Sequence, residues 1–379
     1  MKILDRYIDE LLEKSSPQAP VWNIEKIRSG KKPSWNYIDG CMIKAIIELY
    51  HIKKDKKYLD FADNFIDYFV KEDGSIDSYN PESYNIDNVN AGKTLFDLYK
   101  LTGKEKYRKA IDTVYSQIKG QPRTNAGNFW HKKIYPYQVW LDGLYMGQPF
   151  YMQYEVEYND CKNCLDSYNQ FINVYNILRD KNTGLYYHGY DESKKSFWAD
   201  KETGLSKNFW LRALGWYSMA LIDTIEIMPE SLSKQANELK RIYKEYIDSL
   251  LKYQHESGMW YQVVDKGDLD GNYLETSGSA ILAYSIMKST RIGILDESYY
   301  QYGKKAFDGI CEKYLSEKDG ELQLDGICLV AGLGPEDNKR RDGSYEYYIS
   351  EPVVQNEAKG VAPLILAYVE TLYHDTDNK

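Results

Sequence analysis

Helical periodicity runs through almost the whole chain and restricts the possible folds more than any other feature. Apolar residues recur at the three- and four-residue spacing of an amphipathic helix in about twelve segments. These segments lie near residues 2–14, 37–51, 55–71, 88–102, 104–119, 141–157, 160–179, 207–227, 231–254, 276–291, 295–315 and 357–373. Because short links join consecutive helices, the pattern predicts six αα-hairpins.

A recurring turn motif supports this pairing. A glycine follows a small or acidic residue, and an apolar or aromatic residue comes two positions after the glycine. The copies are Asp73-Gly-Ser-Ile76, Thr183-Gly-Leu-Tyr186, Ser257-Gly-Met-Trp260 and Asp319-Gly-Glu-Leu322. Each follows a long helix, so we expect a helix C-terminal turn that leads into a short extended segment, at one mouth of a barrel.

Together these features predict an all-α fold, an (α/α)6 barrel formed by residues 1–379 as a single domain. No linker rich in proline, glycine or serine divides the chain. An open helical solenoid is the alternative, but the repeats are irregular and neither end shows a polar capping unit.

Charge and hydropathy exclude several classes of partner. The net charge is −9 at pH 7, and no run of lysine and arginine suited to a phosphate backbone is present, which argues against nucleic acid. An anionic substrate would need a local basic pocket. No stretch of eighteen apolar residues predicts a membrane span. The segment Met1–Glu10 carries charges at helical spacing, which predicts a first helix rather than a signal peptide and hence a cytoplasmic protein.

The cysteines do not suggest a cross-linked or metal-binding protein. Five are scattered over the chain: Cys41, Cys161, Cys164, Cys311 and Cys328. An odd number at irregular spacing predicts no disulfide framework. The C-x-x-C pair at 161 and 164 falls in the helix predicted at 160–179, and no second pair or nearby histidine completes a zinc site. We expect structural cysteines and no metal.

Two acids at predicted helix starts are candidates for chemistry. Asp142 lies among aromatic and small residues in Trp140-Leu-Asp-Gly-Leu-Tyr145, and Asp87 lies in Asn85-Ile-Asp-Asn88. A desolvated carboxyl has a raised pKa and could hold a proton near neutral pH, as a general acid must. Each could instead be a helix N-cap. Paired carboxylates are usual in glycosidases, but spacing along the chain does not give their separation in space.

Several longer sequence words occur in order between about residues 35 and 360. They are Trp35-Asn-Tyr-Ile-Asp-Gly40, Asn85-Ile-Asp-Asn-Val-Asn-Ala-Gly92, Trp140-Leu-Asp-Gly-Leu-Tyr-Met-Gly-Gln-Pro-Phe150, Tyr186-Tyr-His-Gly-Tyr190, Asn208-Phe-Trp-Leu-Arg-Ala-Leu-Gly-Trp216, Glu275-Thr-Ser-Gly-Ser-Ala280, Gly326-Ile-Cys-Leu-Val-Ala-Gly-Leu-Gly334 and Tyr347-Tyr-Ile-Ser-Glu351. The ordered set resembles the unsaturated rhamnogalacturonyl hydrolases of glycoside hydrolase family 105. The resemblance covers almost the whole chain and implies the same (α/α)6 barrel.

The resemblance also implies a reaction. Members of this family act on a terminal uronate in which a polysaccharide lyase has left a C4=C5 double bond. By match to the family words, Asp142 is the acid/base that protonates C4 and then deprotonates the water that adds at C5, and Asp87 is its partner. Asp142 must begin protonated, which burial and the Asp87 carboxylate would both favour. No metal or organic cofactor is expected.

A terminal uronate also needs its carboxylate recognised. Arg212 offers a bidentate fork and Lys132 a point charge, although an arginine in an apolar helix is commonly a snorkelling or ion-paired residue. Trp216, four residues after Arg212, shares its helix face and could stack on the sugar, whereas Trp210 could belong to the core.

Three further residues follow from the match to the family words. His188 is expected at the mouth of the site, where it would hydrogen-bond the substrate or the acid. Tyr37 and Trp140 are expected in its wall. A small oligosaccharide with a terminal unsaturated uronate is the expected partner, with no membrane, nucleic-acid or protein partner.

Three alternatives stay open. The first is a sister enzyme that acts on unsaturated glucuronyl units from ulvan, arabinogalactan or glycosaminoglycan; residues at the second sugar would decide, and Ser350, Glu351 and the loop 332–342 are only candidates. The second is a sugar isomerase or epimerase, but such enzymes use several histidines, and the five in this chain are not clustered in the sequence. The third is a noncatalytic sugar-binding barrel, which would have no reason to bury an acid beside arginine and tryptophan.

Overall fold

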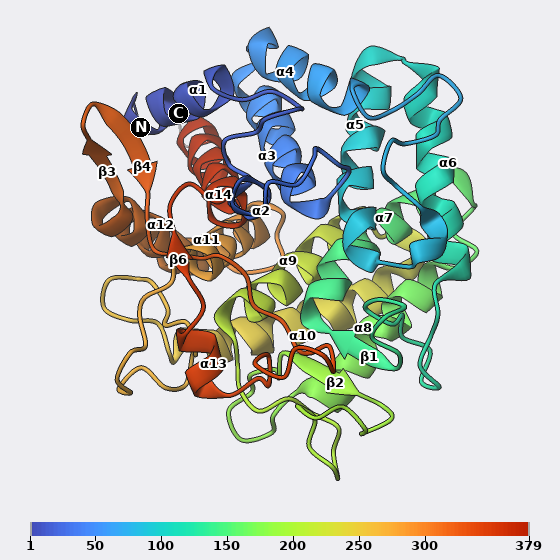
Figure 1. Cartoon of the computed structure of the whole chain (residues 1–379), viewed down its shortest axis with the longest axis vertical. Helices are drawn as coiled ribbons and strands as arrows, with labels where there is room; N and C mark the ends of the chain where they lie inside the picture. Colours follow the sequence, from blue (N-terminus) through green and yellow to red (C-terminus); the bar gives the residue numbers. More distant parts are fainter. Residues whose placement is uncertain (1, 378–379) are drawn as a thin grey trace.

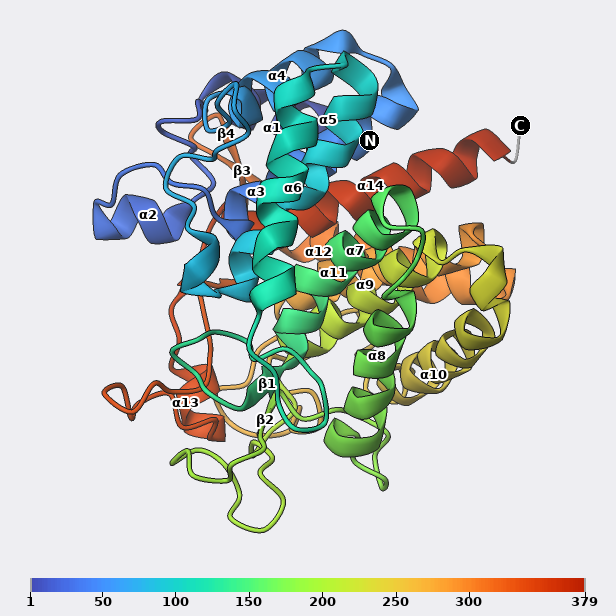
Figure 2. The same ribbon diagram turned by 90° about the vertical axis from the view of Figure 1, so that its right-hand side faces the viewer.

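Six helical segments form a closed inner ring (Figures 1 and 2). The computed structural model describes residues 2–377. The inner segments are α3 (Tyr37–Lys53), the 3-10 helix η2 (Ile86–Gly92) continued by α5 (Lys93–Thr102), α7 (Leu141–Tyr158), α9 (Leu211–Ile227), α11 (Thr276–Arg291) and α14 (Ala358–Asp377). Each packs against the next, and α14 packs against α3. The ring confirms the predicted (α/α)6 barrel.

An outer helix accompanies each inner one. The outer helices are α1 (Lys2–Glu13), α4 (Lys56–Asp67), α6 (Glu105–Gly120), α8 (Cys164–Leu178), α10 (Ser233–Leu251) and α12 (Tyr300–Tyr314). Five of them follow their inner partner directly along the chain. The sixth pair joins the two ends of the chain, since Tyr368 of α14 donates a hydrogen bond of 2.9 Å to Asp5 of α1.

Short elements fill the connections. The helices are α2 (Ile24–Ser29), α13 (Tyr345–Ile349) and the 3-10 turns η1 (Pro81–Ser83), η3 (Glu230–Leu232) and η4 (Glu297–Tyr299). Three antiparallel strand pairs join β1 (Gln138–Trp140) to β2 (Gly189–Asp191), β3 (Leu315–Lys318) to β4 (Glu321–Leu324), and β5 (Ile327–Cys328) to β6 (Val353–Val354). No strand pair was predicted, because runs of two to four residues leave no alternating pattern in the sequence.

All twelve predicted segments correspond to helices, with errors at their starts. The segment predicted from 207 begins at Leu211, because Trp210 is still extended and bridges to Val263. The segment predicted from 295 begins at Tyr300, because η4 precedes it. Hydrophobic periodicity cannot separate an extended entry strand or a 3-10 turn from the first turn of a helix.

Inner helices are buried over most of their surface, and this requires small residues where backbones meet. Every residue of α11 from Thr276 to Thr290 is buried. A Cβ at Gly278 would lie 2.4 Å from a Leu211 side-chain carbon of α9, and a Cβ at Gly40 would lie 2.6 Å from the Cα of Ala91. Glycine at these two positions therefore sets the spacing between neighbouring inner segments.

The recurring turn motif lies where outer helices return to inner ones. Its glycines, at 74, 184, 258 and 320, all have φ between 77° and 87°, in the left-handed region. Extended residues flank three of them, with Val70 bridging to Ile76, Arg179 to Tyr186, and β3 to β4. These returns lead to the N-terminal ends of the inner helices, so this end of the barrel collects the loops.

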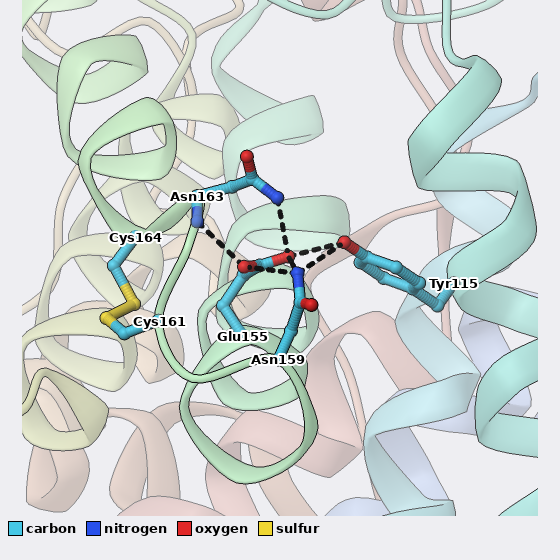
Figure 3. Close-up of a disulfide and its surroundings, with 6 residues drawn as sticks. All are labelled: Tyr115, Glu155, Asn159, Cys161, Asn163 and Cys164. Carbon is cyan, nitrogen blue, oxygen red and sulfur yellow. Dashed lines mark hydrogen bonds between the residues drawn. A yellow bond between two sulfur atoms is a disulfide. The ribbon is translucent and has the colours of Figure 1, made fainter.

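One prediction about the cysteines was wrong. Cys161 and Cys164 form a disulfide, and only Cys164 belongs to α8, which starts there (Figure 3). The buried carboxylate of Glu155 organises the turn: it accepts hydrogen bonds from Tyr115, Asn159 and the backbone of Asn163. A pair three residues apart can bond because this turn, rather than a helix, separates the cysteines. The turn follows the C-terminal end of α7, about 25 Å along the helix axis from Asp142.

Among the described residues, no helix is both long and apolar enough to span a membrane.

Candidate active site

A short strand pair brings the two central groups of the site together. Trp140 of β1 pairs with Gly189 of β2, and the backbone N–H of Leu141 donates to the carbonyl of His188 at 3.0 Å. Asp142 lies in the first turn of α7, directly after β1, and His188 directly before β2. The pairing therefore places the side chain of His188 against that of Asp142, at the N-terminal ends of the inner helices.

His188 connects Asp142 to α13. Its Nε2 atom lies 3.2 Å from Oδ2 of Asp142, and its Nδ1 atom lies 2.7 Å from the hydroxyl of Tyr348. His188 is fully buried, and the Asp142 side chain is 14% exposed. Neither Asp142 Oδ2 nor His188 Nε2 makes a well-directed hydrogen bond within the described part of the chain. Acid and histidine can therefore exchange a proton with little movement.

The expected protonation of Asp142 was wrong for the ligand-free protein. Burial raises the pKa of Asp142, but the attraction of His188 at 3.2 Å, helped by His131, outweighs burial and lowers it. The expected contribution from Asp87 is offset because Lys132 lies 2.7 Å from that carboxylate. The nearest neighbour of Asp142 is thus a base rather than another acid.

Asp87 forms a second group across the site. It lies in η2, where Asn85 is the cap: the Asp87 backbone N–H donates to Oδ1 of Asn85 at 3.2 Å. Besides Lys132, its carboxylate lies 3.4 Å from Nε2 of His131. Asp87, Lys132 and Tyr37 line one cavity of about 590 Å³, together with residues of α2.

The charges around this cavity are mainly positive. Its basic residues are Lys26, Arg28, Lys31 and Lys132, and its acidic residues are Glu25 and Asp87. The acidic chain therefore carries the local basic pocket that an anionic substrate would need.

His131 links the two groups, and sequence reasoning missed it. Its ring stacks on Trp140 with centroids 4.3 Å apart and lies against Gly143, where a Cβ would be 3.0 Å from its Nδ1. Burial lowers the pKa of His131 to about 4, against the attraction of Asp87 and Asp142. The ring of His188 also lies against Trp140, with centroids 5.5 Å apart. The fold thus brings together two histidines, His131 and His188, that are far apart in the sequence.

The neutral state of His131 predicts an acid-sensitive fold. Because its folded pKa of about 4 lies below the ordinary value of 6.5, the unfolded chain binds the proton more readily between these values. This contribution to stability is complete above about pH 6.5 and is lost as the pH falls toward 4, by about 3 kcal/mol. The free energy of unfolding, measured with denaturant at about pH 7.5 and about pH 4, should fall by about 3 kcal/mol less in His131→Gln than in wild type. Equal losses would contradict a neutral buried His131.

Three other predicted residues lie deeper, at the start of α9. Arg212 is 1% exposed, and its Nη1 donates to Ser277 Oγ at 3.1 Å and to the carbonyl of Cys328. Trp216 is 2% exposed and stacks on Tyr145 with centroids 4.9 Å apart. The remaining residue is Trp210, which donates from Nε1 to Gln262 and stacks on Tyr348.

Tyr348 and Glu275 were also missed, although both lie in the sequence words quoted above. Glu275 caps α11 and accepts from the backbone N–H groups of Ser277, Gly278 and Cys328 at 2.7–3.0 Å. The contacts of Tyr348 with His188 and of Glu275 with Cys328 join distant segments, so no local pattern indicates them. Ser277 and Gly278 lie within three residues of Glu275, and this local cap was overlooked.

The arrangement suits proton transfer to a small polar ligand. Asp142 supplies an acid or base, His188 a second proton site, Trp140 an aromatic wall, and the adjoining cavity positive charge. Such a site can protonate a carbon or oxygen atom and then activate water at the same position.

Known proteins show which family uses this barrel. The Glycosyl Hydrolase Family 88 model matches residues 8–374. A solved glycoside hydrolase of family 105 from C. acetobutylicum ATCC 824 is 46% identical, with a TM-score of 0.89, and the match covers 97% of this chain and 98% of that one. The unsaturated rhamnogalacturonyl hydrolase YesR of Bacillus subtilis is 25% identical over 76% of this chain and 78% of its own length.

A further relative is the unsaturated 3S-rhamnoglycuronyl hydrolase of Formosa agariphila, 25% identical over 52% of this chain and 51% of its own length. The chain therefore belongs to glycoside hydrolase family 105 and matches the family 88 model along nearly its whole length.

Proposed function

We propose that this glycoside hydrolase removes a terminal 4,5-unsaturated uronate from lyase-generated oligosaccharides by hydrating its double bond. The observation that carries the proposal is the contact between Asp142 and His188 near a cavity whose charged lining residues are mainly basic. An unsaturated uronate combines a carboxylate, which this charge attracts, with an enol ether, which needs only acid/base chemistry.

One carboxyl can carry both proton transfers. The Asp142 carboxylic acid donates its proton to C4, and the positive charge that forms at C5 is shared with the ring oxygen. Water adds at C5 and returns a proton to the Asp142 carboxylate. The resulting hemiketal opens, and the aglycone leaves from C1 with its hydroxyl group restored.

Substrate binding supplies the protonated form of Asp142. In the free protein the pKa of this carboxyl is lowered, since His188 outweighs the effect of burial. A bound uronate carboxylate adds negative charge and displaces water, and both changes favour the neutral acid. His188 stays within 3.2 Å as the partner that can take or return the proton.

Tyr348 keeps His188 in position for this transfer. Tyr348→Phe removes the hydroxyl 2.7 Å from Nδ1 and keeps the ring that stacks on Trp210. We expect kcat to fall about 3- to 10-fold, the value of one hydrogen bond, with KM within about twofold of wild type. Steady-state kinetics on one unsaturated disaccharide measure both constants. An unchanged kcat would show that the hydroxyl does not orient His188.

The substrate that we favour is the unsaturated rhamnogalacturonan disaccharide. The relative with the rhamnogalacturonyl name aligns over 76% of this chain, against 52% for the rhamnoglycuronyl one, at the same identity. Unsaturated glucuronyl disaccharides, including those from ulvan, are the alternative.

A panel of purified unsaturated disaccharides decides between these substrates. We expect the highest kcat/KM on the rhamnogalacturonan disaccharide. A higher value on an unsaturated glucuronyl disaccharide would replace the substrate and keep the reaction. An isomerase would instead leave the glycosidic bond intact.

A further inference from the structure

An unpaired arginine lies near Trp140, in the wall of the site. Arg341 belongs to the loop between β5 and α13, and no hydrogen bond or ion pair of its guanidinium occurs within residues 2–377. Its Nε atom is buried and without a partner, and the residue as a whole is only partly exposed. Burying part of a cation without a counter-charge is costly, so an unpaired guanidinium in a site suggests an anion that is absent from the free protein.

The loop holds Arg341 against the wall of the site. A Cβ at Gly332 would lie 3.4 Å from Nη1 of Arg341 and 3.4 Å from Cη2 of Trp140, so guanidinium and indole both lie beside this glycine. The Gly334 N–H donates to the carbonyl of Arg341 at 2.8 Å, and the Gly332 N–H donates to the hydroxyl of Tyr347 at 2.9 Å. Backbone bonds thus fix the position of Arg341, while its charged end stays unbonded.

The charge of Arg341 also reaches the basic cavity. Burial raises the pKa of Glu25, which lines that cavity, but Lys359 outweighs burial, and Arg212 and Arg341 lower the pKa further. Arg341 therefore lies within electrostatic range of the cavity from the Trp140 side.

Three other cations near the site are already bonded, whereas Arg28 and Lys31, which also line the cavity, are exposed to solvent. Lys132 is paired with Asp87 at 2.7 Å, and Lys26 donates to the carbonyl of Ser34 at 2.9 Å. Arg212 is 1% exposed and bonded to Ser277 and Cys328. A carboxylate binds best to a planar pair of free N–H donors, which Arg341 still offers.

We propose that Arg341 binds the carboxylate of the terminal unsaturated uronate and so determines specificity for an acidic sugar. This inference rests on the proposed function and extends it. It assigns the main carboxylate contact to Arg341 rather than to Arg212 or Lys132. Binding there would hold the uronate against Trp140, next to the Asp142–His188 pair.

A comparison of acid and ester substrates tests the assignment. Arg341→Gln is measured on the unsaturated rhamnogalacturonan disaccharide and on its uronate methyl ester, which keeps the enol ether and removes the negative charge. We expect kcat/KM on the free acid to fall about 10- to 100-fold, mainly through KM, and the wild-type and variant values on the ester to agree within about threefold. Arg341→Lys should give an intermediate loss on the acid, since it keeps the charge without the fork.

Lys339→Gln is the matched control, because it removes an exposed positive charge from the same loop and should behave as wild type. Thermal unfolding of each variant shows whether the fold is kept. An equal loss on acid and ester would overturn the carboxylate contact. If kcat/KM of Arg341→Gln fell only on substrates whose second sugar is acidic, Arg341 would bind the aglycone instead, and the assignment would also be overturned. If the wild-type enzyme converted none of the unsaturated uronides, the proposed function itself would be wrong.

Discussion

Asp142→Asn is expected to fold as wild type does and to lower kcat by about 10³-fold. Asparagine keeps the shape of the side chain beside His188 but can neither donate a proton to C4 nor accept one from water. Positioned acid/base groups typically contribute about 10²- to 10⁴-fold, and here one group serves both steps. Loss of ultraviolet absorbance by the unsaturated substrate measures the rate. KM should change little, because the carboxylate contacts of the substrate lie elsewhere.

Asp160→Asn provides a matched control. Asp160 is exposed and follows α7 at the end opposite to Asp142, so the same substitution there should leave kcat unchanged. If Asp142→Asn kept more than about a tenth of wild-type kcat, the assignment of Asp142 as acid/base would fail.

Glu275→Ala is expected to have the largest effect on stability. The carboxylate is fully buried and is the acceptor for three backbone N–H groups, those of Ser277, Gly278 and Cys328. Alanine leaves these donors without a partner and removes the N-cap of α11. We expect a loss of about 3–5 kcal/mol in the free energy of unfolding, measured in guanidinium.

Glu275→Ala also removes support from Arg212, which lies below the site at the start of α9. Arg212 donates to Ser277 and to the carbonyl of Cys328, the two residues that Glu275 holds in place. Glu275→Gln is the control, since its amide oxygen can still accept from two of the three donors and should cost about 1–2 kcal/mol. Equal stability of Glu275→Ala and wild type would show that water replaces the carboxylate.

The barrel could be predicted because it follows from local patterns. Twelve segments with a helical period, linked by turns that need glycine at positive φ, restrict a chain of this length to stacked helical hairpins. The starts of α9 and α12 were misplaced, because extended and 3-10 entries have the same apolar composition as the helices that follow.

The site was predicted in part, and the missing part depends on contacts between distant segments. Asp142 and Asp87 stood out because each begins a helix among small residues. The protonation of Asp142 was wrong because it depends on His188, which the β1–β2 pair brings to it. Tyr348 comes from α13 and Arg341 from the loop before it. The sequence suggested the loop 332–342 only as a candidate contact for the second sugar, and no local pattern indicates that either residue lies at the wall of the site.

One measurement tests the central claim most directly: the unsaturated rhamnogalacturonan disaccharide is incubated with the enzyme in D₂O, while ultraviolet absorbance and free rhamnose are followed together. Hydration predicts that absorbance disappears as rhamnose is released and that the uronate product carries deuterium at C4. Release of rhamnose ahead of the loss of absorbance would show direct hydrolysis of the glycosidic bond, because the freed unsaturated uronate would lose its chromophore only afterwards. That result would contradict protonation of C4 by Asp142.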